Sequence, residues 1–211
     1  MAKPYGKKMD KFQKDIKSIL DVLTKDYRLI IDIIEDCSQK SVLEAKQALN
    51  ADNISNSLNK LDSKIVDMLS LKETSKDEIK MASIYLKVNS DLSKVSSKTR
   101  TVITELESCC RDLENKAIRK YAVKIYKNII KSLNSLNKMI DHDDEDEITD
   151  LYEQIVILEF KTDNIYEDIN RYIMKEFCGK DSHEAIMKVF RKSETIAART
   201  LSAASLIKFG N

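Results

Sequence analysis

Apolar residues recur at alternating steps of three and four along most of the chain, which is the spacing of one face of an α-helix. Six such stripes can be followed, and each predicts a helix of about 25 to 33 residues, or roughly 40 to 50 Å. The sixth stripe is weaker, because Ser193 and Thr200 take two of its positions. The stripes run over residues 12–34, 54–68, 81–106, 118–140, 148–172 and 186–207.

Capping residues suggest where these helices begin and end. Ser38 or Ser41 can cap the second helix, and Ser75 stands three residues before Glu78, which is the spacing of a capping box for the third. The boundary between the third and fourth helices contains no helix breaker, so its position is the least defined. That boundary is expected at 107–115, and the boundaries before and after the fifth helix are expected in the polar stretches 141–147 and 178–184.

Composition agrees with an all-α protein. The 211 residues include 3 glycines and 1 proline, 34% are charged and 6% are aromatic, which favours long amphipathic helices over sheets. The net charge of +1 does not supply the basic field of a nucleic-acid binder.

The chain shows no apolar leader and no run long enough to span a membrane, so we expect a cytoplasmic protein. The cysteine spacings fit neither zinc nor a disulfide framework, which predicts reduced thiols at Cys37, Cys109, Cys110 and Cys178.

The chain also contains an internal repeat. A shift of 101 residues pairs Ile54 with Ile155, and the same shift pairs Asp62 with Asp163. Because the apolar stripes also superpose, each half is interpreted as one three-helix unit. We therefore predict two tandem three-helix bundles packed side by side, covering residues 8–108 and 109–208.

Two segments resemble a known family. The stretch "EIKMASIYLKVNSDLSKVSS", residues 78–97, fits a pattern of D-L-R followed by L-K-I-S-S-D-L-E-R-I-G-D, with "LKVNSDLS" over its second part. In the second half "SETIAART", residues 193–200, lies over the end of the same pattern. The chain thus resembles the PhoU family, the cytoplasmic regulators of bacterial phosphate uptake. The resemblance implies a non-enzymatic homodimer that contacts the nucleotide-binding subunit of a phosphate ABC transporter and a sensor histidine kinase, and restrains both uptake and phosphate-responsive signalling. Through these partners it would lie peripheral to the inner membrane.

The family pattern also implies metal clusters held by Glu/Asp-x-x-x-Asp pairs on the second and third helices of each repeat. Carboxylates four residues apart share a helix face and can bridge one cation. The second repeat keeps Glu159, Asp163 and Glu194, but Ala198 takes the place of the fourth acid. These three are candidate ligands for a weakly bound iron or zinc ion, or else ordinary solvated acids.

The first repeat has lost most of the corresponding acids, so we expect it to bind no metal. Only Asp62 remains. The other three places are taken by residues without a carboxylate: Leu58, Ser93 and Ser97.

A line of lysines lies opposite the apolar stripe of the fourth predicted helix. It is either a solvated outer face or a strip that docks on an acidic partner or on anionic lipid headgroups. Its members are Lys116, Lys120, Lys124, Lys127 and Lys131.

Enzymatic sites are not visible in the sequence. The chain lacks the Glu-x-x-His motifs of ferritin-like bundles, a Gly-rich phosphate loop and a Ser-His-Asp grouping. The acidic stretch 141–147 lacks the glycine and the final glutamate of a calcium loop, and is better explained as a helix cap. We therefore expect no catalytic or cofactor-binding residues. The alternatives to a PhoU-like regulator are a metal-binding helical bundle and a helical scaffold unrelated to phosphate.

Overall fold

The computed structural model describes seven stretches of the chain, and all regular structure in them is helical. The all-α prediction is therefore confirmed. The stretches are 7–36, 38–51, 53–71, 74–110, 112–142, 144–176 and 183–210. The helices are α1 (Lys7–Asp36), α2 (Gln39–Ala51), α3 (Ile54–Leu69), α4 (Lys76–Ser108), the short 3₁₀ helix η1 (Asp112–Glu114), α5 (Lys116–Asp141), α6 (Glu145–Glu176) and α7 (Glu184–Gly210).

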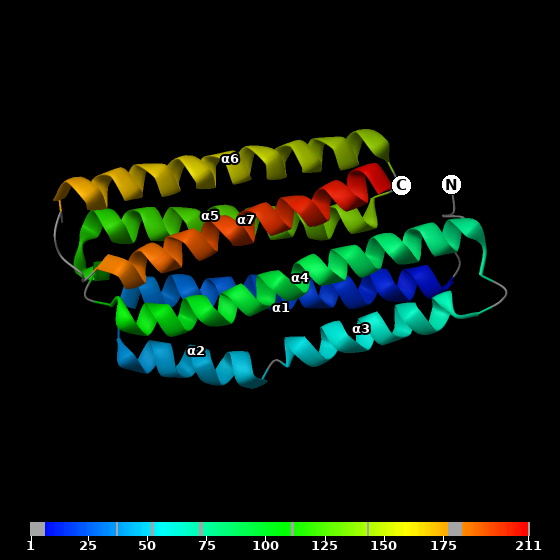
Figure 1. Ribbon diagram of the computed structural model, residues 1–211, viewed down its shortest axis with the longest axis horizontal. Helices are drawn as coiled ribbons and strands as arrows, with labels where there is room; N and C mark the ends of the chain where they lie inside the picture. Colours follow the sequence, from blue (N-terminus) through cyan, green and yellow to red (C-terminus); the bar gives the residue numbers. More distant parts are fainter. Residues whose placement is uncertain are drawn as a thin grey trace.

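The helices lie roughly along one direction in an elongated bundle (Figure 1). In Figure 1, α6 forms one long edge, α2 and α3 together form the opposite edge, and α1, α4, α5 and α7 lie between them. The most extensive packing joins α4 to α7, and α1 packs along α5. Helices that occupy matching positions in the two halves of the chain therefore lie against each other.

Short capping motifs define several helix ends. The capping box of Ser75 and Glu78 is present, with Glu78 N donating to Ser75 Oγ at 3.2 Å and Ser75 N donating to Glu78 Oε2 at 2.9 Å. Asp144 caps α6, because its Oδ1 accepts from Glu147 N at 3.1 Å. The acidic stretch before α6 thus acts as a helix cap, as the sequence suggested. Asp143 lies outside the described residues.

The boundary between α4 and α5, which contains no helix breaker, is also defined by a capping residue. α4 ends at Ser108, and α5 begins at Lys116 after the single turn of η1. The side chain of Asn115 accepts hydrogen bonds from Ala117 N at 2.9 Å and Ile118 N at 3.3 Å. An asparagine cap can begin a helix without glycine or proline.

The second predicted helix is divided into α2 and α3, of 13 and 16 residues. α2 starts directly after Ser38, whose Oγ accepts from Ser41 N at 3.1 Å, so Ser38 rather than Ser41 is the cap. Between the two helices Asn53 has φ 40° and ψ 37°, the left-handed conformation that ends helical hydrogen bonding. A single helix of about 30 residues was therefore the wrong expectation for this segment.

The apolar stripes of all the helices meet in one core. Tyr27 of α1 and Tyr126 of α5 are fully buried there and stack with ring centroids 6.0 Å apart. Cys109 is buried and Cys110 partly buried, and the Sγ atom of each lies within hydrogen-bond distance of Leu106 O. Cys37, Cys178 and Gly179 lie outside the described residues. None of the helices in the described stretches has the length and apolar content needed to cross a membrane.

Candidate functional site

The three acids of the second half converge between α6 and α7. Glu159 and Asp163 lie one turn apart on α6, and Glu194 lies on α7, each with a half-buried side chain. Burial raises the pKa of Glu159, and the nearby carboxylates of Asp163 and Glu194 raise it further. Burial and the charge of Asp163 likewise raise the pKa of Glu194. The three carboxylates therefore lie close enough together for their charges to interact.

Asp163 differs from the other two acids in having a buried carboxylate oxygen, Oδ1, without a hydrogen-bond partner among the described residues. Burial raises its pKa, and so does the charge of Glu167 one turn further along α6. Such a group gains if a cation approaches it, because a buried carboxylate oxygen without a donor is costly.

The cluster does not form a ready metal centre. Within the described stretches, no three His, Cys, Asp or Glu side chains are placed together so that they could hold one ion. The place of the fourth family ligand is taken by Ala198, whose methyl group cannot coordinate. The donor set therefore does not fit a closed cluster, and binding of iron or zinc by Glu159, Asp163 and Glu194 stays a prediction.

The corresponding positions of the first half are used for packing. Asp62 Oδ1 accepts a hydrogen bond from Asn89 Nδ2 at 2.7 Å, and the same amide donates to Leu58 O at 2.9 Å. The Leu58 side chain is buried in the core. Asn89 is fully buried, so this amide links α4 to α3 inside the molecule. The one acid that remains in the first half thus has a structural partner.

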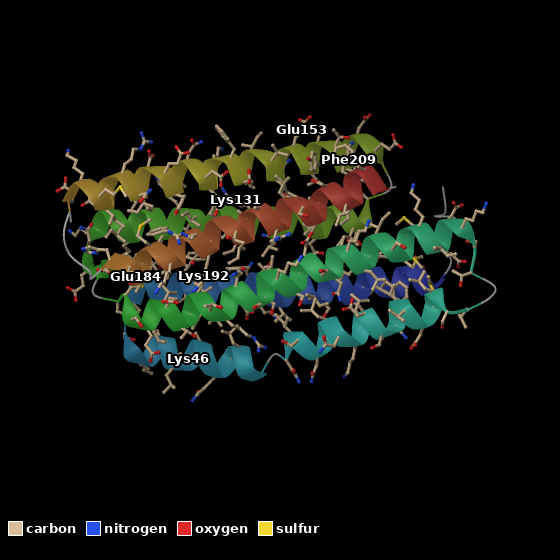
Figure 2. The ribbon with its side chains drawn as sticks, in the orientation of Figure 1. Lys46, Lys131, Glu153, Glu184, Lys192 and Phe209 are labelled. Carbon is tan, nitrogen blue, oxygen red and sulfur yellow. The ribbon has the colours of Figure 1, made fainter. Side chains whose placement is uncertain are left out.

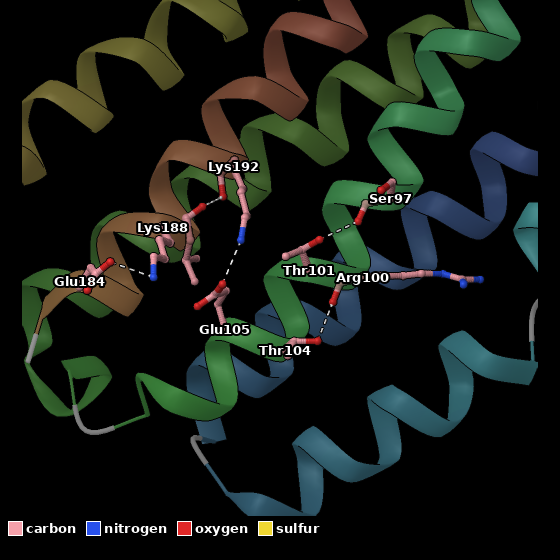
Figure 3. Close-up of polar contacts among 10 residues, drawn as sticks. Ser97, Arg100, Thr101, Thr104, Glu105, Glu184, Lys188 and Lys192 are labelled. Carbon is pink, nitrogen blue, oxygen red and sulfur yellow. Dashed lines mark hydrogen bonds and ion pairs between the residues drawn. The ribbon is translucent and has the colours of Figure 1, made fainter.

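Ser93 and Ser97 are exposed on α4. Near them, hydroxyl groups bond back to their own helix: Thr101 Oγ1 donates to Ser97 O at 3.0 Å, and Thr104 Oγ1 donates to Arg100 O at 3.2 Å (Figure 3). The hydroxyl groups of these two threonines therefore have their hydrogen-bond acceptors within α4.

A charged network joins α4 to α7, and sequence reasoning missed it. Asp91, 5% exposed, accepts hydrogen bonds from Ser202 Oγ at 2.7 Å and Arg199 Nη1 at 3.3 Å. Lys192 of α7 pairs with Glu105 of α4 at 3.0 Å, as the dashed line in Figure 3 shows. Asp91 belongs to the "LKVNSDLS" segment, but its partners lie more than 100 residues away. The only sign of this network in the sequence was an acidic residue, Asp91, between two buried positions of the apolar stripe, Val88 and Leu92.

Each of the two stacked tyrosines, Tyr27 and Tyr126, bonds to the last helix of its own half. Tyr27 Oη and Thr99 Oγ1 are 2.6 Å apart, and Ser193 Oγ and Tyr126 Oη are 2.7 Å apart. Burial raises the pKa of both phenols, so both remain neutral. Thr99 is the polar position of the third stripe and Ser193 is one of the two in the sixth, and the structure explains both as hydroxyl partners for these rings.

The two histidines lie at helix ends, away from the acid cluster. His142 pairs with Glu147 at the start of α6, and His183 Nδ1 lies 2.9 Å from Asp112 Oδ1 of η1. Burial raises the pKa of Asp112, while His183 lowers it.

A comparison of the chain with protein-family models, with curated proteins and with solved structures found no match.

Proposed function

We propose that this chain is a PhoU-like regulator that controls phosphate uptake and phosphate-responsive signalling through protein contacts. It would bind the nucleotide-binding subunit of a phosphate ABC transporter and a sensor histidine kinase. The segment "LKVNSDLS" and its counterpart in the second half support the proposal. The single observation that carries it furthest is the packing of α1 along α5 and of α4 along α7, because helices at matching positions of the two predicted repeats then lie against each other.

The available chemistry favours binding over catalysis. The acids, amides and tyrosines described above hold helices together, and long rigid helices offer faces suited to protein recognition. The regulator would therefore act by occupying a partner surface.

A deletion strain tests this role directly. With phosphate in excess, loss of the gene should raise phosphate uptake and switch on phosphate-responsive transcription, and the wild-type gene should restore both. Purified chain should also bind the isolated transporter subunit in a titration. Unchanged uptake together with unchanged transcription in the deletion strain would reject the proposal.

Metal binding by the second half is a second candidate, which the enclosed Oδ1 of Asp163 favours. Elemental analysis of protein purified without chelator measures it, with Asp163→Asn as the matched variant. We expect metal well below one equivalent in the wild type and less in the variant. Tightly held, near-stoichiometric iron or zinc would contradict the expectation of a weak, incomplete site.

A further inference from the structure

Three large apolar side chains are exposed close together on α6, within five consecutive residues. Val156 is 36% exposed, Ile157 52% and Phe160 65%. Single apolar side chains on a surface are ordinary, but a group of three on one helix is typical of a contact surface. Because α6 also carries ten acids against three basic residues, these side chains lie in a negative field.

Two of these side chains belong to a row along the seam between α6 and α7. Tyr152, Val156 and Phe160 follow one another at steps of four, so they lie along one side of α6. That side faces α7, because Ser205 Oγ donates to Tyr152 Oη at 3.4 Å and the Tyr152 ring packs edge-on against Phe209, with centroids 5.4 Å apart. Phe209, 69% exposed, lies near the end of α7 beside α6 (Figure 2). The apolar row therefore consists of Phe209, Tyr152, Val156 and Phe160.

The acid cluster adjoins the end of this apolar row. Asp163 follows Phe160 by three positions on α6. Burial and the charge of Asp163 raise the pKa of Glu194 across the seam, and the charge of Arg191 lowers it. Among the described residues, no lysine or arginine forms an ion pair with Glu159, Asp163 or Glu194. Because Asp163 Oδ1 is also buried without a donor from this part of the chain, the cluster gains from a cation that brings its own hydrogen-bond donors.

We propose that the apolar row and the acid cluster together bind a basic amphipathic helix of a partner protein. Its apolar side chains cover Val156 and Phe160, and an arginine beyond them reaches Asp163 and Glu194. From Tyr152 to Asp163, α6 rises roughly 17 Å, so a helix of about three to four turns covers the whole face. Arginine suits the acid cluster, because its guanidinium can donate to two carboxylates at once and is more weakly hydrated than an ammonium group.

A basic amphipathic helix fits this face better than other occupants do. A metal ion would neutralise the acids but leave Val156 and Phe160 in water, and an anionic membrane would be repelled by the acids. A second copy of the chain does not match the face either. Its basic helix, α5, exposes the lysines of the predicted strip but no large apolar side chain over its described length. The inference rests on the proposed function only in that the chain acts by contact with other proteins.

A synthetic helical peptide tests the proposal in solution. It has about 16 residues, with leucines at steps of three and four along one face and arginines flanking them. With EDTA present, fluorescence anisotropy should show that it binds the purified chain with a Kd of about 10 μM. A second peptide, with glutamine in place of arginine, should bind at least about tenfold more weakly, because it brings no charge to the acid cluster.

Two pairs of substitutions separate the apolar and acidic parts of the face. Val156→Ser with Phe160→Ser should weaken the binding of both peptides at least about tenfold, because the apolar contact is lost. Asp163→Asn with Glu194→Gln should weaken only the arginine peptide to this extent, since the glutamine peptide has no charged contact to lose.

Matched control variants remove similar groups elsewhere on the surface. Leu43→Ser with Val66→Ser removes exposed apolar side chains from α2 and α3. Asp32→Asn with Asp67→Asn removes two exposed acids from α1 and α3. Both control variants should bind the two peptides as the wild type does. Circular dichroism checks that all four variants keep their helix content.

Several outcomes would overturn the proposal. One is an arginine peptide that does not bind the wild type at about 0.1 mM, and another is a loss of affinity in the controls as large as in the face variants. Binding that occurs only without EDTA would make a metal ion the cation at the acids. A wild-type dimer that Val156→Ser with Phe160→Ser dissociates in sedimentation would make a second copy the occupant. None of these results depends on phosphate uptake in the deletion strain, so the two proposals can fail separately.

Discussion

At the residue scale, Asn89 shows that the first half uses a position of the implied metal site for helix packing, because its amide donates a hydrogen bond to Asp62, the one acid that remains. The sequence identified Asp62 as the one acid that remains, but it could not identify Asn89 as its partner. The two residues are 27 positions apart, and their contact depends on how α3 lies against α4. Ser93 and Ser97 fit the same interpretation, because exposed hydroxyl groups need no ligand.

Replacing Asn89 by aspartate tests the importance of this amide. Asn89→Asp has nearly the same shape, but it removes both donated hydrogen bonds and places a second carboxylate against Asp62. We expect the free energy of unfolding at pH 7 to fall by about 3 kcal/mol in urea denaturation. Ser90→Asp, one position away and exposed, should change it by less than about 0.5 kcal/mol. Equal effects of the two variants would contradict the proposed role.

The acid cluster predicts a pH dependence whose sign can be worked out. The pKa of Glu194 is raised in the folded state, so the folded protein binds more protons than the unfolded chain, and stability falls as the pH rises through this range. Glu194→Gln should therefore stabilise the protein at pH 7, by about 0.5 kcal/mol after allowance for solvent screening.

The gain should disappear near pH 4, below the unfolded pKa of a glutamate. Thermal unfolding at both pH values measures it, and Glu153→Gln on the exposed side of α6 is the control. A gain that is the same at both pH values would mean that charge repulsion is not the cause.

At the element scale, apolar periodicity located the helices well, but it did not reveal the division of the second one. The stripes predicted the extent of α4 and α6 because long amphipathic helices repeat one pattern many times. The turn at Asn53 depends on the backbone angles of a single residue and leaves the stripe of α3 intact. Asparagine tolerates the left-handed conformation better than most residues, and this was the only signal present.

Substitutions at Asn53 test whether this turn is needed. Asn53→Ala should lower the free energy of unfolding by about 1 kcal/mol, because a Cβ-bearing residue without a compensating side chain is strained at φ 40°. Asn53→Gly should be neutral or slightly stabilising, since glycine adopts this conformation freely. Chemical denaturation of both variants gives the comparison. If alanine were tolerated as well as glycine, α2 and α3 would have to join as one helix.

At the scale of the whole molecule, the sequence predicted two three-helix units but not which of their helices meet. An apolar stripe shows that a face is buried, yet it does not name the helix that covers it. Only the structure places α4 against α7, with Asp91 bonded to Arg199 and Ser202 across that contact. It also places Tyr27 against Tyr126, so the two halves share aromatic packing as well as a polar network.

This shared core predicts that the halves unfold together. Tyrosine fluorescence, which includes the stacked pair between α1 and α5, and far-ultraviolet circular dichroism, which reports all the helices, should give coincident urea transitions. Asp91→Ala removes the acceptor for Ser202 and Arg199, so the free energy of unfolding should fall by about 2 kcal/mol while the transitions remain coincident. Lys94→Ala, at a half-exposed residue whose Nζ lies 3.6 Å from Asp91 Oδ1, should change it by less than about 0.5 kcal/mol. Two separate transitions in the wild type would mean that each half is stable without the other, and that the contact between α4 and α7 forms only after both have folded.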